Sequence, residues 1–139
     1  MKVVSKYLSV DAKADVDIKD ITGAVQDAVT GSEVKNGTVT VFVPGSTGSV
    51  STLEYEPGLL KDIPRALERL APSGMDYAHH QTWHDDNGKS HVRATIIGPS
   101  LVVPIIDGRV IHGTWQQIVF MNLDTSARRR DIVLQIMGE

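Results

Sequence analysis

The sequence has no cysteine, and this absence excludes several kinds of chemistry. A chain of 139 residues without a thiol forms no disulfide, carries no thiolate nucleophile and builds no cysteine-ligated zinc or iron–sulfur site. Any metal site must therefore draw its ligands from histidine, aspartate and glutamate.

Two further absences concern the protein's surroundings. No segment approaches the run of ~20 apolar residues that crosses a membrane. The N-terminal stretch MKVVSKYLSVDAKADVDI alternates polar and apolar residues instead of forming the apolar run of a signal peptide. The formal net charge of −3 gives no general attraction to nucleic acid or to an anionic membrane. We therefore expect a cytoplasmic protein that binds neither nucleic acid nor membrane.

The length and the 41% hydrophobic content suit one ordinary core, and no repeat or linker divides the chain, so we expect a single domain over residues 1–139. Helical spacing of apolar residues predicts one helix over 20–31 and a second over 59–70. Short β-branched runs predict strands at 3–10, at 38–43 and through the last third of the chain. Because helices and strands do not alternate regularly, the pattern predicts an α+β fold with mostly antiparallel strand pairs and two principal helices.

Four of the five histidines lie in one polar stretch, Tyr77 to His91, which has no clear period. Imidazole and carboxylate groups bind divalent metals and transfer protons, so this density favours a site, although a solvated surface loop is the ordinary alternative. The run VRATIIG after His91 predicts a strand that would hold His91 rigidly while the preceding loop brings His79 and Asp86 towards it. The interleaved side chains are His79, His80, His84, Asp85, Asp86 and His91.

Other segments carry groups that suit an anion. PGSTGS places Ser46 and Thr47 in a glycine-containing loop whose N–H groups and hydroxyls can face a phosphate, although an ordinary connection between strands is the simpler interpretation. The run Arg128–Arg130 has the fork geometry that suits phosphate or carboxylate, with a solvated turn as the alternative. Trp115 and Gln116 stand at the start of a predicted strand, where the amide can satisfy either the backbone or a ligand.

Taken in order, these segments resemble the YjbQ-type family, some members of which are credited with secondary thiamine-phosphate synthase activity. The resemblance covers roughly residues 37–139. It rests on the ordered motifs YAHHQTWHDDNGKSH, GPS and GTWQ, followed by the arginine run and a terminal strand ending in IMGE. It implies an α+β fold with mixed, mostly antiparallel sheets that assembles as a homotrimer, with polar groups clustered near a subunit boundary.

Residue by residue, the resemblance implies a set of roles. His79, His91 and Asp86 are its candidate catalytic groups, and the same three residues with Glu54 are candidate ligands of a divalent metal, magnesium or zinc. The candidate binding residues for a small phosphorylated substrate are Ser46, Thr47, Asn87, Trp115, Gln116, Arg128 and Arg130.

The chain departs from the family pattern at two polar positions. Gly45 stands where many members have a histidine that opens the loop, and Asn122 stands where an acidic residue is usual. Three hypotheses remain open. The first is a synthase that joins a hydroxymethylpyrimidine diphosphate to a thiazole phosphate and releases pyrophosphate. The second is a trimer that binds a metal or a small phosphorylated molecule without turnover, and the third is a metal-dependent hydrolase.

Overall fold

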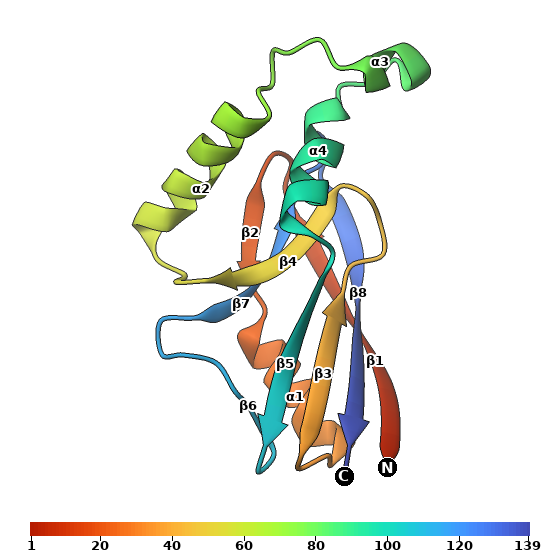
Figure 1. The fold of residues 1–139 in the computed structure, drawn as a ribbon, viewed down its shortest axis with the longest axis vertical. Helices are drawn as coiled ribbons and strands as arrows, with labels where there is room; N and C mark the ends of the chain where they lie inside the picture. Colours follow the sequence, from red (N-terminus) through yellow and green to blue (C-terminus); the bar gives the residue numbers. More distant parts are fainter.

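Two antiparallel sheets form the centre of the molecule in a computed structural model that describes all residues, 1–139. The larger sheet has the strand order β1-β8-β3-β5-β6, and the smaller sheet has the order β2-β7-β4 (Figure 1). The predicted α+β class is confirmed, and every strand pair is antiparallel. The strands are β1 (Lys2–Ala12), β2 (Asp17–Asp20), β3 (Gly37–Phe42), β4 (Gly48–Leu53), β5 (Ser100–Ile106), β6 (Arg109–Val110), β7 (Gln117–Asn122) and β8 (Arg128–Gly138).

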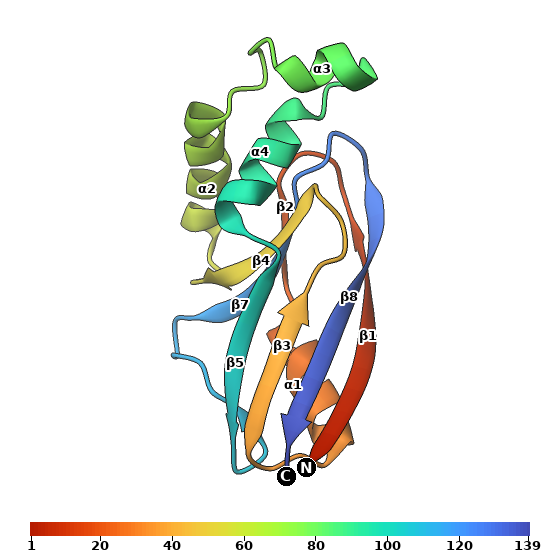
Figure 2. The same ribbon diagram turned by 45° about the vertical axis from the view of Figure 1, so that its right-hand side comes forward.

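Helix α1 (Thr22–Ser32) covers one face of the larger sheet and forms the main core with it (Figure 2). The Asp20 carboxylate accepts hydrogen bonds from Thr22 N (3.0 Å) and Thr22 Oγ1 (2.7 Å), which satisfies a free donor at the start of the helix. Val25 and Val29 lie on its buried face and have no exposed surface. Each such side chain contributes about 1.5–3 kcal/mol through burial.

One face of the smaller sheet packs into the main core. Helices α2 (Pro57–Leu70) and α4 (Gly88–Ile97) cover its other face, so this sheet is buried on both sides. Leu67 of α2 packs with Ala94 of α4 against Val119 of β7. The short helix α3 (Ala78–Trp83) has no buried residue and extends beyond α4 at one end of the molecule (Figure 1). None of the four helices combines the length and the apolar character needed to cross a membrane.

The predicted strand after His91 is wrong, because these residues belong to helix α4. Its buried positions include Ser90, Arg93 and Ala94, a helical spacing that two polar residues conceal in the sequence. The stretch before it, which showed no clear period, contains α3. The structure therefore adds two helices to the two that were predicted.

A buried arginine joins α4 to the end of α2. Arg93 is 2% exposed, and it donates to the carbonyl of Ala71 from both Nε (3.1 Å) and Nη2 (2.8 Å). Nη2 also donates to Glu68 Oε2 at 2.8 Å, and Glu68 in turn accepts from the hydroxyl (2.7 Å) and the N–H (2.8 Å) of Ser73. These bonds from Ser73, with a smaller contribution from Arg93, lower the pKa of Glu68 to about 2.

The register of the smaller sheet separates its two ends. Gly48 of β4 pairs with Asn122 of β7, whereas Leu53 pairs with Gln117. Five residue steps of about 3.3 Å place these pairs roughly 17 Å apart. A residue next to Asn122 therefore cannot share a site with a residue next to Gln117 in the same chain.

Candidate functional site

A buried carboxylate, Asp124, lies at the Asn122 end of the smaller sheet. It is the second residue after β7 and is 2% exposed. Its Oδ2 accepts a hydrogen bond from Thr47 Oγ1 at 2.9 Å and lies 3.4 Å from Arg128 Nε and 3.7 Å from an Arg130 terminal nitrogen. Its Oδ1 accepts from Ser126 N at 2.8 Å. We call Thr47, Asn87, Asn122, Asp124, Arg128 and Arg130 the Asp124 cluster.

The surroundings of Asp124 keep its carboxyl group ionised. Burial on its own raises the pKa of Asp124, but the hydrogen bonds from Ser126 and Thr47 and the charge of Arg128 together hold this pKa below its usual value of 3.8. Two guanidinium groups against one carboxylate leave one net positive charge. The cluster can therefore attract an anion.

Arg130 lies near the start of β8, and only 14% of its side chain is exposed. Its Nη2 donates to Thr47 Oγ1 and to Asn122 Oδ1 (3.4 Å). Its Nε is buried without a hydrogen-bond partner. Burial lowers the pKa of Arg130 from its ordinary value, and the charge of Asp124 opposes this effect. Arg130 remains a cation at neutral pH.

Asn87 connects the start of α4 to the turn between β7 and β8. Its Oδ1 accepts hydrogen bonds at 3.0 Å from Thr125 N, Thr125 Oγ1 and Ser90 Oγ. Its Nδ2 lies 3.4 and 3.5 Å from the two oxygens of Asp124. The same amide group therefore fixes the N-terminus of α4, which carries a partial positive charge, beside the buried carboxylate.

His79 and His91 lie together, as the sequence predicted. Their ring centroids are 4.4 Å apart, with His79 on α3 and His91 on α4. The carboxylate beside them is Asp85 rather than Asp86: Asp85 Oδ1 is 3.2 Å from His79 Nε2, without the alignment of a hydrogen bond. Position 88 must be glycine for α3 to lie here, because a Cβ would be 2.5 Å from Tyr77 Cβ.

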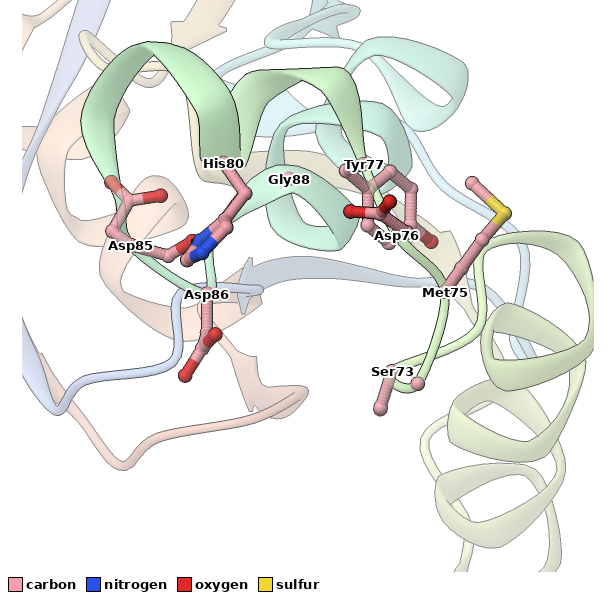
Figure 3. A pocket seen from close by; sticks show the side chains of 9 residues that line it. Ser73, Met75, Asp76, Tyr77, His80, Asp85, Asp86 and Gly88 are labelled. Atoms are coloured by element: carbon pink, nitrogen blue, oxygen red, sulfur yellow. The ribbon is translucent and has the colours of Figure 1, made fainter.

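Asp86 lines a different space, a pocket of about 240 Å³ under α3 (Figure 3). His80, Asp85 and Asp86 form one side of this pocket, and Met75 and Asp76 lie on the other. The Nδ1 atom of His80 is 2.7 Å from the Asp85 carbonyl oxygen. The pocket is therefore acidic and does not include His79 or His91.

The four candidate metal ligands do not meet. Glu54 follows β4 at the Leu53 end, away from Gly48 and the Asp124 cluster, and Asp86 lines the separate pocket beneath α3. Across the whole chain, no three His, Asp or Glu side chains are grouped so that they could hold a metal ion. The donor set of this chain therefore does not fit the magnesium or zinc ion that the family resemblance implied.

Trp115 and Gln116 also lie away from the Asp124 cluster, because they precede β7 at its Gln117 end. The Gln116 amide is used within the chain: Oε1 accepts from Gly113 N (2.9 Å) and Nε2 donates to Thr52 Oγ1 (3.3 Å). Trp115 is 74% exposed. Of the predicted binding residues, the structure brings together Thr47, Asn87, Arg128 and Arg130.

The sequence prediction missed Asp124. In the run NLDTS this residue resembles an ordinary turn aspartate, whose side chain bonds the backbone two residues on, and it does so with Ser126. The available signal was its place between a continuous apolar strand and the arginine run. A carboxylate at the end of a buried strand is positioned to meet cations that follow it.

Comparisons with known proteins agree on one family. Residues 6–139 match the family described as UPF0047 protein YjbQ-like. A UPF0047 protein of Archaeoglobus fulgidus is 41% identical over 85% of this chain and 90% of its own length, and one of Methanothermobacter thermautotrophicus is 37% identical over 100% and 95%. The crystal structure of a YbjQ-like protein of unknown function from Sulfolobus solfataricus is similar with a TM-score of 0.93, at 33% identity over 99% of both chains.

Proposed function

Because the chain belongs to the UPF0047, YjbQ-like family, and because two guanidinium groups surround a single carboxylate in its Asp124 cluster, we propose that it binds a small phosphorylated molecule there. The observation that supports this most is the net positive charge of the trio Asp124, Arg128 and Arg130. Arg128 is half exposed, so the cluster reaches the surface. Guanidinium groups and hydroxyls are the donors that proteins commonly offer to phosphate.

The loop before β4, which provides Thr47 to the cluster, also borders a pocket that no side chain of the cluster lines. A pocket of about 260 Å³ is lined by Gly45, Ser46 and Gly48 on one side and by Thr95 of α4 on another. Ser46 is exposed, whereas Thr47 is buried and hydrogen-bonded to Asp124. Ser46 is thus the residue of this loop that is free to contact a ligand.

The reaction that we propose is that of a secondary thiamine-phosphate synthase. A bond forms between the thiazole nitrogen and the methylene carbon of the pyrimidine, and the bond from that carbon to the diphosphate oxygen breaks. The electron pair leaves with the diphosphate, so negative charge develops on the leaving group. Arg128 and Arg130 stabilise this charge. His79 and His91 are the proposed donors of a proton to the departing diphosphate oxygen.

The test is an assay of the purified protein with the two thiamine precursors, with thiamine phosphate as the measured product. We expect product from the wild type and a decrease in kcat/KM of about 10²-fold or more in Arg130→Gln, the range for loss of one preorganised donor. Arg129→Gln is the matched control, because Arg129 is exposed on the neighbouring position of β8. Absence of product from the wild type would leave the non-catalytic binding protein, the second hypothesis. The hydrolase needs three ligands on one metal ion and has no such group within the chain.

Assembly as a homotrimer is part of the same proposal, together with a cytoplasmic location. The face of the larger sheet that points away from α1 supports the assembly. No side chain is charged in the three rows that run from Val3, Ser5 and Tyr7 across β8 and β3 to β5. Large apolar side chains are exposed on this face, among them Tyr7 (74%) and Val102 (60%). Interface centres are depleted of charge in this way.

A further inference from the structure

The guanidinium group of Arg130 is held on one side and free on the other. Nη2 makes both of its hydrogen bonds, to Thr47 and Asn122, and the nearest carboxylate, Asp124, lies on the same side. Nη1 takes part in none of these bonds. Because the side chain is largely buried, its orientation is set by the protein before any ligand arrives.

Gly45 provides the room for Nη1. A Cβ at this position would lie 3.0 Å from Arg130 Nη1, which is closer than carbon and nitrogen normally approach. Gly45 also has φ = +133°, a conformation that other residues rarely adopt. A side chain at position 45 would therefore displace the end of Arg130 or move the loop.

At this place the chain has no group of three His, Asp or Glu side chains that could hold a metal ion. The side chains that approach the anion site are Thr47, Asn87, Asn122 and the two arginines, with Asp124 as the single carboxylate. One carboxylate that is already paired with two guanidinium groups is a poor ligand set for a divalent ion. The two guanidinium groups are therefore the cations that this site can offer to a phosphate.

We infer that Arg130, positioned by Thr47 and accommodated by Gly45, takes the role of a metal ion in this site. The site then binds a phosphate group without a divalent cation, and residue 45 determines whether the guanidinium can reach it. This inference rests on the proposed phosphate-binding function, and it specifies the chemistry of that site.

Titration calorimetry with inorganic phosphate tests the inference on the full-length protein after treatment with EDTA. We expect binding that EDTA leaves unchanged and that added magnesium or zinc strengthens by less than about twofold. Arg130→Gln should weaken binding by about tenfold or more, because the variant loses a charge-assisted hydrogen bond to the phosphate. Arg129→Gln, with the same change of charge on an exposed neighbour, should stay within about twofold of the wild type.

Gly45→Ala tests whether position 45 must lack a side chain for Arg130 to reach the phosphate. We expect the phosphate affinity of this variant to fall by about threefold or more. Gly23→Ala is its control, because a Cβ at Gly23 meets nothing within 4 Å. If Gly45→Ala does not fold, as judged by circular dichroism, Arg130→Lys replaces it: this variant keeps the charge and loses the fork, so its affinity should lie between those of the wild type and Arg130→Gln.

Five outcomes overturn the inference: no phosphate binding by the wild type, loss of binding on chelation, a gain of about tenfold or more with a metal, full affinity in Arg130→Gln, or full affinity in a folded Gly45→Ala. Its failure is distinct from failure of the synthase. Chelator-resistant phosphate binding without thiamine phosphate formation supports the inference and rejects the synthase. Product formation together with metal-dependent phosphate binding does the reverse.

Discussion

At the scale of single residues, Asp124 has the largest expected effect on stability. Its charge is buried, and it accepts hydrogen bonds from Thr47 and Ser126 while it forms ion pairs with two arginines. Asp124→Asn keeps the size of the side chain but leaves Arg130 largely buried without an anion. Because removal of one partner from a buried charged network is costly, we expect the free energy of unfolding to fall by about 2–4 kcal/mol.

Urea denaturation at neutral pH measures this change, and Asp131→Asn on β8 is the control. Asp131 is exposed and bonded to Ser9, so its replacement should change the free energy of unfolding by less than about 1 kcal/mol. The folded-state pKa of Asp124 is depressed, so its contribution is present above the ordinary pKa of 3.8 and is lost as the pH falls below it. Equal stability of the two variants at pH 7 would contradict the role assigned to Asp124.

Some residues of the candidate site could be predicted from the sequence, because the chemistry of their side chains is informative by itself. The His79–His91 pair and the Arg128–Arg130 run stood out because imidazole and guanidinium groups are informative wherever they lie. Glu54 was misplaced because its membership of a site depends on strand register, which no residue type reveals. Asp124 was missed because a turn aspartate and a buried aspartate have the same local sequence.

At the scale of elements, Arg93 of α4 is connected to the end of α2 by hydrogen bonds to Glu68 and to the carbonyl of Ala71. We call these bonds the Arg93 clamp. Glu68 also accepts two hydrogen bonds from Ser73. These bonds, with a smaller contribution from Arg93, lower the pKa of Glu68 to about 2. A depressed folded-state pKa means that the stabilisation is fully present above the ordinary value of 4.5 and disappears as the pH falls through about 2.

Glu68→Gln should therefore lower the urea midpoint at neutral pH, and its difference from the wild type should shrink steadily on acidification towards pH ~2. Because the Glu68 side chain is half exposed, added salt should reduce the effect. Asp62→Asn, which breaks an exposed pair with Arg65 on the same helix, is the control and should change the midpoint little. A difference between wild type and Glu68→Gln that does not depend on pH would reject the ionised clamp.

The elements themselves were predictable to different degrees, and α4 shows why. Helices α1 and α2 have apolar residues at helical spacing, and this periodicity is sufficient to predict both of them. In α4 the buried face carries Ser90 and Arg93, whose partners are Asn87, Ala71 and Glu68. A buried polar face looks exposed in a sequence, and the β-branched run VRATII then favoured a strand. The tertiary hydrogen bonds of Ser90 and Arg93 favour the helix, and the local sequence pattern does not reveal them.

At the scale of the whole molecule, the larger sheet has α1 on one face (Figure 2), and three rows of uncharged side chains lie on the other face. An antiparallel sheet that faces water normally alternates apolar and polar residues, with charges on the outer side. Here Tyr7, Phe42, Val102 and Met137 are exposed outwards instead. An apolar surface of this kind in a stable protein is usually covered, and copies of the same chain cover it in the proposed trimer.

A charge placed on this face tests the assembly. Val102→Lys should convert the trimer to monomer in sedimentation velocity at micromolar concentration, because the lysine would lose its hydration at the centre of the interface. Val92→Lys is the matched control: Val92 is also exposed, but it lies on α4, away from the sheet face, so this variant should sediment as the wild type does. Both variants should unfold cooperatively, since neither valine belongs to the buried core. A monomeric wild type, or a trimer that Val102→Lys leaves intact, would show that this face is not the contact between copies.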